Sequence, residues 1–186
     1  QSGSGGGVQL TNVTQSTGIQ VDGVTINNTT GTPSIDALRI QGSTGGLNST
    51  GVSLTGVNAL TTTANGGSAL HISTNANLGV AIDSSGSIFT GSYGINLQAP
   101  SGYIYFDASS QSQSFVANGS HIAGINAVSA INASIQLGSS TITGFDTGIN
   151  ASNFYGSFIE MTGGSINALV TGIRADATGG RSNIES

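Results

Sequence analysis

The chain has 186 residues, of which 95 are Gly, Ser, Thr or Asn, and its three Arg, eight acidic residues and absence of Lys give a net charge of −5. It therefore lacks the basic surface that binds a phosphate backbone or an anionic membrane, and it has no apolar run of about 18 residues that could span a bilayer. The absence of Cys excludes disulfides, zinc–thiolate sites and cysteine nucleophiles.

Residues 1–7 contain only Gln, Ser and Gly and lack the charged and apolar regions of a signal peptide. We interpret them as a flexible linker or a processed end, followed by a single domain over residues 8–186. The 19 Ile residues of the chain favour strands, whereas Gly, Ser, Thr and Asn are all poor residues for helix interiors. We therefore expect an all-β fold.

One short phrase recurs along the chain: a small residue, an aliphatic residue, a polar residue and a second apolar residue. Its copies are TGIQV at 17–21, DALRI at 36–40, SALHI at 68–72, YGINL at 93–97, AGINA at 123–127, TGINA at 147–151 and TGIRA at 171–175. The last two copies belong to a longer repeat, in which residues 135–151 match residues 159–175 at an offset of 24.

Further phrases lie between these copies and also alternate apolar with polar residues. The second phrase appears as GVTI at 23–26, GVSL at 51–54, GVAI at 79–82, YIYF at 103–106, SIQL at 134–137 and FIEM at 158–161. The third appears as SIF at 87–89, TIT at 141–143 and SIN at 165–167. This period of two predicts strands with one buried face, and the intervening Gly, Ser and Asn clusters predict turns.

Two or three short strands in every 24 or so residues predict a solenoid, because one coil cannot bury its own inward face whereas stacked coils can. We expect a right-handed parallel β-helix of about seven coils of 24–26 residues, with three short strands per coil. The stretches 42–50, 61–67 and 107–114 are expected to bulge as loops. Because the pattern contains no capping helix, we interpret the chain as a fragment of a longer solenoid or as a subunit that stacks end to end.

Two acids are candidates for a shared site. Asp83 follows GVAI and Asp107 follows YIYF, 24 residues apart, so the pattern places them at equivalent positions on neighbouring coils. Stacked carboxylates could hydrolyse glycosidic bonds or bind Ca²⁺, whereas exposed Asp residues in turns cap local backbone amides. We favour the turn interpretation, because no third acid joins the column. We expect no catalytic residue, no metal site and no cofactor.

The polar position of the first phrase predicts a column of outward side chains. Its members are Gln20, Arg39, His71, Asn96, Asn126, Asn150 and Arg174. Such a column could bind a glycan or pair with another molecule, and it could also stabilise the stack through amide hydrogen bonds, which is the interpretation we favour. The two His residues, His71 and His121, are not at equivalent positions, so we expect surface histidines and no shared metal or catalytic triad.

An aromatic zone surrounds the fourth copy of the second phrase. Tyr103 and Tyr105 alternate with Ile104 and Phe106, so the two tyrosines are expected to point outward. An exposed tyrosine ring can stack on a sugar, and both residues are therefore candidates for glycan binding.

The GIxA and GVxI phrases, and lines such as IEMTGGSINALVTGIRADATGG at 159–180, resemble the passenger domains of autotransporters from Gram-negative bacteria. The resemblance extends over nearly all of the chain from about Val8. It implies a secreted right-handed β-helix on the bacterial cell surface that functions in adhesion, self-aggregation or biofilm formation.

Our leading hypothesis is a non-enzymatic adhesin that acts by side-to-side contact, with another copy, a surface glycan or a host receptor as partner. One alternative is an extracellular filament subunit that stacks end to end. Another is a polysaccharide-binding or polysaccharide-degrading β-helix, like those of tailspikes and pectinases. The low charge favours surface contact over catalysis, and we expect neither a nucleic-acid partner nor membrane insertion by this segment.

Overall fold

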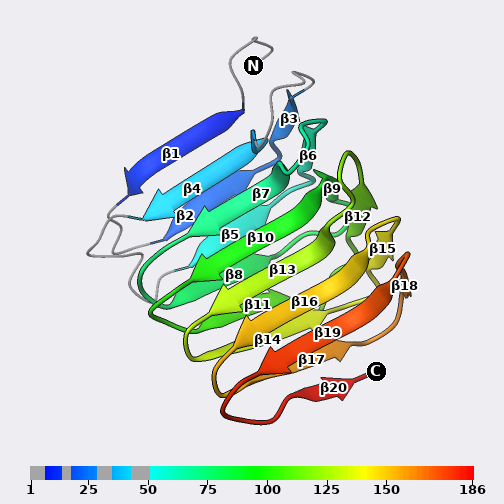
Figure 1. Cartoon of the computed structure of the whole chain (residues 1–186). Helices are drawn as coiled ribbons and strands as arrows, with labels where there is room; N and C mark the ends of the chain where they lie inside the picture. Colours follow the sequence, from blue (N-terminus) through cyan, green and yellow to red (C-terminus); the bar gives the residue numbers. More distant parts are fainter. Residues whose placement is uncertain (1–6, 14–17, 29–34, 43–50) are drawn as a thin grey trace.

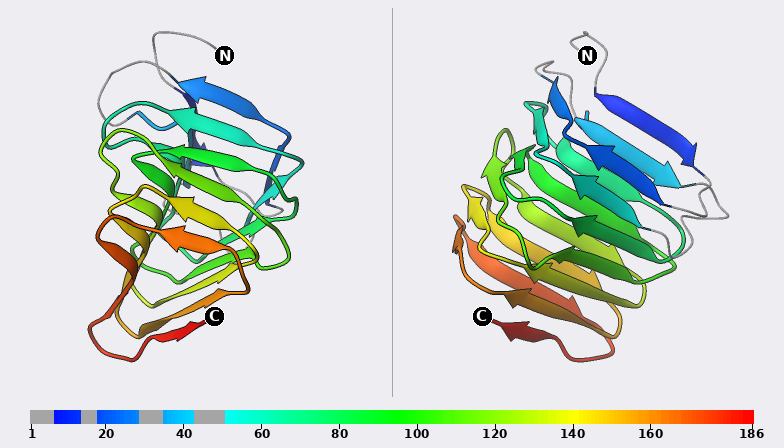
Figure 2. Two further views of the ribbon diagram at one scale, coloured as in Figure 1. Left: turned by 90° about the vertical axis from the view of Figure 1, so that its right-hand side faces the viewer. Right: turned by 180° about the vertical axis from the view of Figure 1, so that it is seen from behind.

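The computed structural model describes residues 7–13, 18–28, 35–42 and 51–186, and these residues form a right-handed parallel β-solenoid with three sheets (Figure 1). The all-β expectation is confirmed, since no helix occurs among the described residues. The described part accordingly has no helix long and apolar enough to cross a membrane. Strands β1 and β20 lie at opposite ends of the stack, and the coils between them follow the chain in order (Figure 2).

Each sheet takes one strand from successive coils. Sheet A contains β1(Val8–Val13), β4(Leu38–Gly42), β7(Ser68–Ser73), β10(Tyr93–Ala99), β13(Ala123–Ser129), β16(Thr147–Asn153) and β19(Thr171–Ala177). Sheet B contains β2(Ile19–Asp22), β5(Val52–Thr55), β8(Leu78–Ile82), β11(Ile104–Ala108), β14(Asn132–Leu137), β17(Gly156–Met161) and β20(Asn183–Glu185). Sheet C contains β3(Thr25–Asn28), β6(Ala59–Thr62), β9(Ile88–Gly91), β12(Ser114–Ala117), β15(Thr141–Thr143) and β18(Ser165–Asn167).

The core consists of apolar side chains stacked in columns along the solenoid axis. In sheet A, one column runs through Leu38, Leu70, Ile95, Ile125, Ile149 and Ile173. In sheet C, the rings of Phe89 and Phe115 stack with their centroids 5.3 Å apart and their planes 16° from parallel. These columns explain why the coils stack, because each buried side chain is covered by its equivalent in the next coil.

The register differs from the sequence prediction in the first coil. TGIQV does not belong to sheet A, because Ile19 pairs with Val52 in sheet B, and Val8 instead takes the position opposite Leu38. The neighbouring GVTI phrase lies partly in sheet C, where Ile26 pairs with Leu60. The inward faces of all three sheets carry the same period-two pattern, so the phrase alone does not identify the sheet.

Two further phrases were placed in the wrong register. YIYF shifts by two residues, since Tyr105 and not Tyr103 pairs with Gly79. SIF shifts by one relative to TIT at 141–143, since Phe89 and not Ile88 joins the column of Phe115 and Ile142. Two of the stretches expected to bulge overlap strands: 61–67 begins within β6, and 107–114 includes the end of β11 and the start of β12. Residues 43–50 of the third stretch and residues 1–6 of the expected linker lie outside the described residues.

A buried polar ladder marks the corner between sheets B and C. The side chain of each member accepts a hydrogen bond from the backbone N–H of its equivalent in the preceding coil: Val24 N to Asn58 Oδ1, Asn58 N to Ser87 Oγ, Ser87 N to Gln113 Oε1 and Gln113 N to Ser140 Oγ, all at 2.9–3.1 Å. This ladder satisfies backbone donors at a position where the chain leaves one sheet for the next. It holds the corners in line and so fixes the outward faces of the sheets relative to one another.

Candidate functional site

The outward face of sheet B carries two parallel columns of side chains. The first column contains Gly51, Gly79, Tyr105, Ser134 and Phe158. The second contains Ser53, Ala81, Asp107, Gln136 and Glu160. Neighbours within a column lie on adjacent strands, about 4.8 Å apart. Two coils with small side chains are therefore followed by a coil that presents an aromatic ring and a carboxylate.

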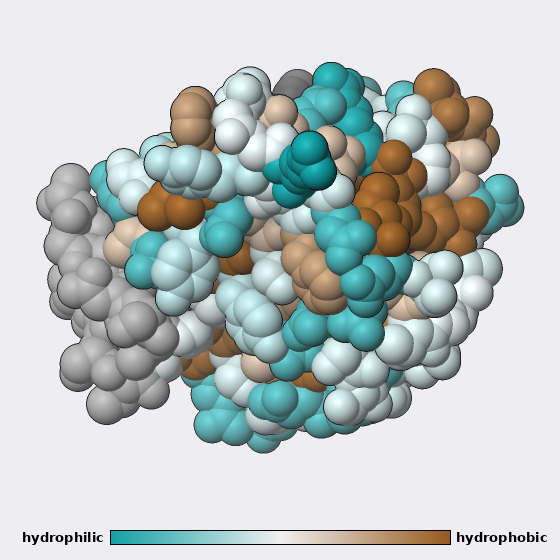
Figure 3. All heavy atoms as spheres, turned by 90° about the horizontal axis from the view of Figure 1, so that it is seen from below, coloured by the Kyte–Doolittle hydropathy of each residue, from teal (hydrophilic) through white to brown (hydrophobic). Residues whose placement is uncertain are grey.

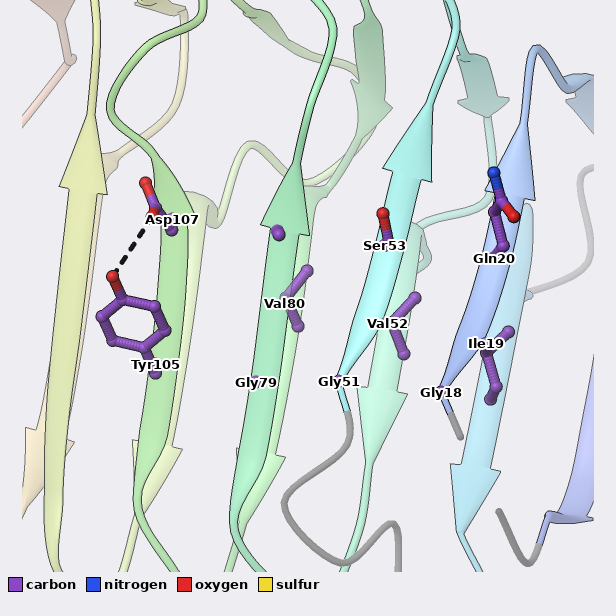
Figure 4. A pocket seen from close by; sticks show the side chains of 11 residues that line it. Gly18, Ile19, Gln20, Gly51, Val52, Ser53, Gly79, Val80, Tyr105 and Asp107 are labelled. Carbon is purple, nitrogen blue, oxygen red and sulfur yellow. Dashed lines mark hydrogen bonds between the residues drawn. The ribbon is translucent and has the colours of Figure 1, made fainter. Parts of the chain in front are cut away.

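The change from small to large side chains hollows this face beside Tyr105. Figure 4 shows Tyr105 and Asp107 together on β11, followed by Gly79 on β8 and by Gly51 and Gly18, which directly precede β5 and β2. These residues line a hollow of about 640 Å³, which we call the Tyr105 groove. A volume of this size is in the range of sites that hold small molecules.

Two glycines on the floor of the groove differ in how much room surrounds them. Backbone packing requires glycine at residue 51, whereas residue 79 has space for a side chain. A Cβ atom at Gly51 would lie 2.4 Å from the carbonyl oxygen of Gly79, so the close approach of the two strands requires glycine there. A Cβ atom at Gly79 would be no nearer than 3.6 Å to Gly51 Cα, which is ordinary contact. A larger side chain at residue 79 would therefore fill the groove without moving the backbone.

A second hollow lies on the other side of the same ring. It has a volume of about 440 Å³, and its lining includes Asn77, Tyr103, Tyr105, Asn132 and Ser134. Tyr103 and Tyr105 are 37% and 41% exposed, so the expectation that both point outward is confirmed. The ring of Tyr105 lines both hollows and lies at the centre of the site.

A chain of hydrogen bonds holds the Tyr105 ring in place. The Tyr105 hydroxyl lies 3.1 Å from Asp107 Oδ2 and 3.0 Å from Gln136 Oε1, and either oxygen can accept its proton. Gln136 Nε2 in turn donates to Glu160 Oε2 at 3.2 Å. On the other side, Asp107 Oδ1 accepts hydrogen bonds from the backbone N–H and the hydroxyl of Ser109 at 2.9 and 2.7 Å. The ring is thus positioned by side chains from two adjacent strands.

These contacts also set the charge of the site. The backbone N–H of Ser109 is the largest influence on Asp107, and with the Ser109 and Tyr105 hydroxyls it lowers the pKa of this carboxyl despite partial burial. Desolvation, followed by the hydrogen bond to Asp107 and its charge, raises the pKa of Tyr105. At neutral pH the pair is therefore a carboxylate and a neutral phenol, which gives the groove a hydrogen-bond acceptor rather than a proton donor.

The expected stacking of Asp83 and Asp107 is wrong. Asp107 lies opposite Ala81 in the register of β8 and β11, and Asp83 follows two residues later along the chain. Asp83 is exposed, and its Oδ2 accepts a hydrogen bond of 2.6 Å from Ser53 Oγ on the neighbouring coil. The error arose because alternation repeats every two residues and leaves a shift of two undetermined. The described residues contain no group of three or more metal-ligating side chains.

The expected sheet A column has the predicted members from Arg39 onward but not the expected exposure. Arg39, His71, Asn96, Asn126, Asn150 and Arg174 follow one another in register, with Gln9 rather than Gln20 before them. At its centre, Asn126 Nδ2 donates to Asn96 Oδ1 at 2.9 Å and Asn150 Nδ2 donates to Asn126 Oδ1 at 2.7 Å. Asn96 and Asn126 are only 7% and 9% exposed, so these two amides support the stack and do not face a partner.

His71 is also not the surface histidine that was expected, whereas His121 is exposed. His71 Nδ1 lies 2.9 Å from Asp36 Oδ2, and Asp36 Oδ1 accepts the backbone N–H of Ser68 at 2.8 Å. Burial by itself would raise the pKa of Asp36, but the hydrogen bonds and charge of His71 and Ser68 outweigh burial and lower it. No local sequence signal indicates the roles of Asp36, Gln136 and Glu160, since each acts through a residue on another coil.

Searches against family models, curated proteins and solved structures found no match to this chain. The fold defines the class of protein, a parallel β-solenoid built from repeated coils.

Proposed function

We propose that the protein is a non-enzymatic adhesive solenoid of the bacterial cell surface that binds extended glycans along the outward face of sheet B. The observation that carries this proposal is the Tyr105 groove, in which a fixed aromatic ring stands beside a floor of glycines. The groove runs across successive coils, so an extended polymer can lie along it. The polar, weakly charged repeat and its resemblance to autotransporter passengers support placement outside the cell.

The chemistry of the groove favours neutral or amino-bearing sugars. The Tyr105 ring offers an apolar face for the C–H groups of a sugar ring. Asp107, Gln136 and Ser53 offer carboxylate, amide and hydroxyl groups that can bond to sugar hydroxyls. Because Asp107 is ionised and Glu160 follows two coils later in the same column, an acidic sugar would be repelled here.

Binding is favoured over hydrolysis by the state and placement of the acids. Glycosidases need one carboxyl group with a raised pKa to protonate the leaving oxygen and a second carboxyl across the bond. In this groove the pKa of Asp107 is lowered, and Asp83 occupies a different column. Both features support a site that holds its ligand unchanged.

A glycan-binding assay with variants of the groove tests this proposal. Tyr105→Ala should weaken binding of neutral and amino-sugar oligosaccharides by about tenfold, because it removes the stacking surface. Gly79→Val should weaken binding similarly by filling both hollows, while its Cβ fits beside Gly51. Isothermal titration calorimetry with disaccharides and tetrasaccharides measures both effects.

Tyr155→Ala is the matched control, because Tyr155 is exposed but lies two coils from Tyr105. It should change the disaccharide affinity by less than a factor of two. Equal affinities for the parent protein and the two groove variants, or no saturable binding of any oligosaccharide, would remove the basis for a glycan site in this groove.

Self-association is a second candidate, favoured by exposed apolar side chains at the corner between sheets A and B. Val128, Ile131, Phe154 and Tyr155 are 39%, 37%, 48% and 60% exposed, and we call them the corner ridge. Tyr155 N–H donates to the carbonyl of Ile131 at 2.8 Å, so the ridge continues from one coil to the next. Seen from the C-terminal end of the stack, hydrophobic surface lies in separate areas within a mainly polar exterior (Figure 3). Two copies could bury such a ridge side by side.

Phe154→Ser combined with Tyr155→Ser should shift a concentration-dependent dimer to monomer, because it removes the largest apolar surface of the ridge. Light scattering coupled to size-exclusion chromatography measures the mass over a concentration series. Val116→Ser, which changes an exposed residue of sheet C, should leave the dimer intact. A parent protein that remains monomeric at every concentration would contradict side-to-side association.

A further inference from the structure

Arg39 on β4 lies in a polar hollow on the outward face of sheet A, apart from the Tyr105 groove. The hollow has a volume of about 250 Å³, and its lining includes Gln41 on the same strand, Ser73 and Asn75 from the next coil and Gln98 from the coil after that. Gln41, Ser73 and Gln98 follow one another in register, so they form one side of the hollow. Among the described residues that line it there is no acidic side chain.

The guanidinium of Arg39 has an unsatisfied donor. Its Nε is buried and has no hydrogen-bond acceptor among the residues that the structure describes. A buried donor without an acceptor is costly, and most buried polar side-chain atoms in proteins have a hydrogen-bond partner. Because Nε is itself closed to solvent, a ligand meets the part of the Arg39 side chain that lines the hollow, and the positive charge there has no carboxylate beside it among the residues that line the hollow.

Arg174 provides a direct comparison, since it occupies the same column of sheet A at the other end of the stack. Arg174 Nε lies 2.7 Å from Asp176 Oδ2 and is exposed. In the part of the chain that the structure describes, the other ion pair joins His71 to Asp36, so Arg39 has no acidic partner. Asp36, on the same coil as Arg39, is already engaged by His71 and Ser68.

We propose that the Arg39 hollow is a binding site for a small oxyanion, a carboxylate or sulfate group. The planar guanidinium can donate two parallel hydrogen bonds to such a group. The amides of Gln41 and Gln98 and the hydroxyl of Ser73 supply further uncharged donors around it. The same chemistry occurs in a free inorganic anion and in the acidic sugar of a polysaccharide. This site therefore favours negatively charged ligands, which the Tyr105 groove repels.

The test is an affinity measurement with sulfate, galacturonate and neutral galactose at low ionic strength, where screening is weak. Arg39→Gln should weaken sulfate and galacturonate binding by at least about tenfold, as expected for loss of charge-assisted hydrogen bonds. Arg174→Gln, the matched control, should change either affinity by less than a factor of two. Circular dichroism checks that each variant is folded, and Arg39→Lys, which keeps the charge without the planar fork, should bind with intermediate affinity.

The ligands distinguish the source of the oxyanion. Galacturonate binding more tightly than sulfate, with no binding of galactose, supports an acidic sugar, whereas equal affinities for sulfate and galacturonate support a site for free oxyanions. The proposal is overturned if Arg39→Gln and Arg174→Gln behave alike, if galactose binds as well as galacturonate, or if neither anion shows saturable binding. Because Tyr105→Ala does not alter this hollow, failure here leaves the glycan proposal for sheet B standing, and the reverse also holds.

Discussion

Replacing Phe115 with alanine should lower the free energy of unfolding by about 3–5 kcal/mol, the usual cost of removing a fully buried aromatic side chain. Phe115 is completely buried in sheet C and stacks on Phe89. Its loss leaves a cavity between Phe89 and Ile142 on the neighbouring coils. Since a domain is typically stable by only about 5–15 kcal/mol, the variant should unfold at a much lower urea concentration than the parent.

Phe154→Ala provides the matched control, because it removes the same side chain from an exposed position. It should cost less than about 1 kcal/mol, as surface substitutions usually do. Urea unfolding followed by circular dichroism gives both values. Equal shifts for the two variants would mean that Phe115 does not belong to a packed column.

Replacing Asn126 with aspartate should destabilise the protein by about 3 kcal/mol or more, because it places a charge in a buried column and removes a donor. The amide of Asn126 donates to Asn96 Oδ1 and accepts from Asn150 Nδ2. A carboxylate at this position can still accept from Asn150, but it repels the oxygen of Asn96. The loss should shrink at low pH, where the introduced carboxyl is protonated and can donate again.

Asn167→Asp is the control for the change of charge alone, because Asn167 is exposed at the end of β18. It should alter the free energy of unfolding by no more than about 0.5 kcal/mol. Thermal unfolding of both variants at neutral and acidic pH checks the prediction. If Asn126→Asp were as stable as the parent at neutral pH, the hydrogen bonds of Asn126 to Asn96 and Asn150 would not stabilise the fold.

The solenoid class could be read from the sequence, because an unbroken offset of 24 places Ile125, Ile149 and Ile173 in one column. The outward direction of Tyr105 followed from alternation within its strand. The coil assignment of TGIQV could not be read in this way, since every inward face has the same pattern. In the last coils, the constant offset of 24 determines the register. In the earlier coils, insertions of unequal length remove this constant offset, so the sequence does not determine their register.

The candidate site was only partly predictable. The sequence indicated Tyr105 and Asp107, but their relation to Gly79 and Gln136 depends on a register that alternation fixes only to within two residues. Burial of Asn96 and Asn126 also escaped prediction, because an outward position on a strand does not determine how fully neighbouring side chains cover it. The pairing of Asp36 with His71 joins residues 35 positions apart and has no local signal.

The central functional claim is that a glycan lies on the outward face of sheet B, and mapping the bound surface by nuclear magnetic resonance tests it most directly. Titration with the tightest-binding neutral or amino-sugar oligosaccharide should shift the backbone amide signals of Gly79, Tyr105 and Ser134 together, since these residues are adjacent in register. The same titration of Tyr105→Ala should give much smaller shifts. Shifts confined to sheet A, sheet C or the corner ridge, with the signals of β8, β11 and β14 unchanged, would contradict the claim.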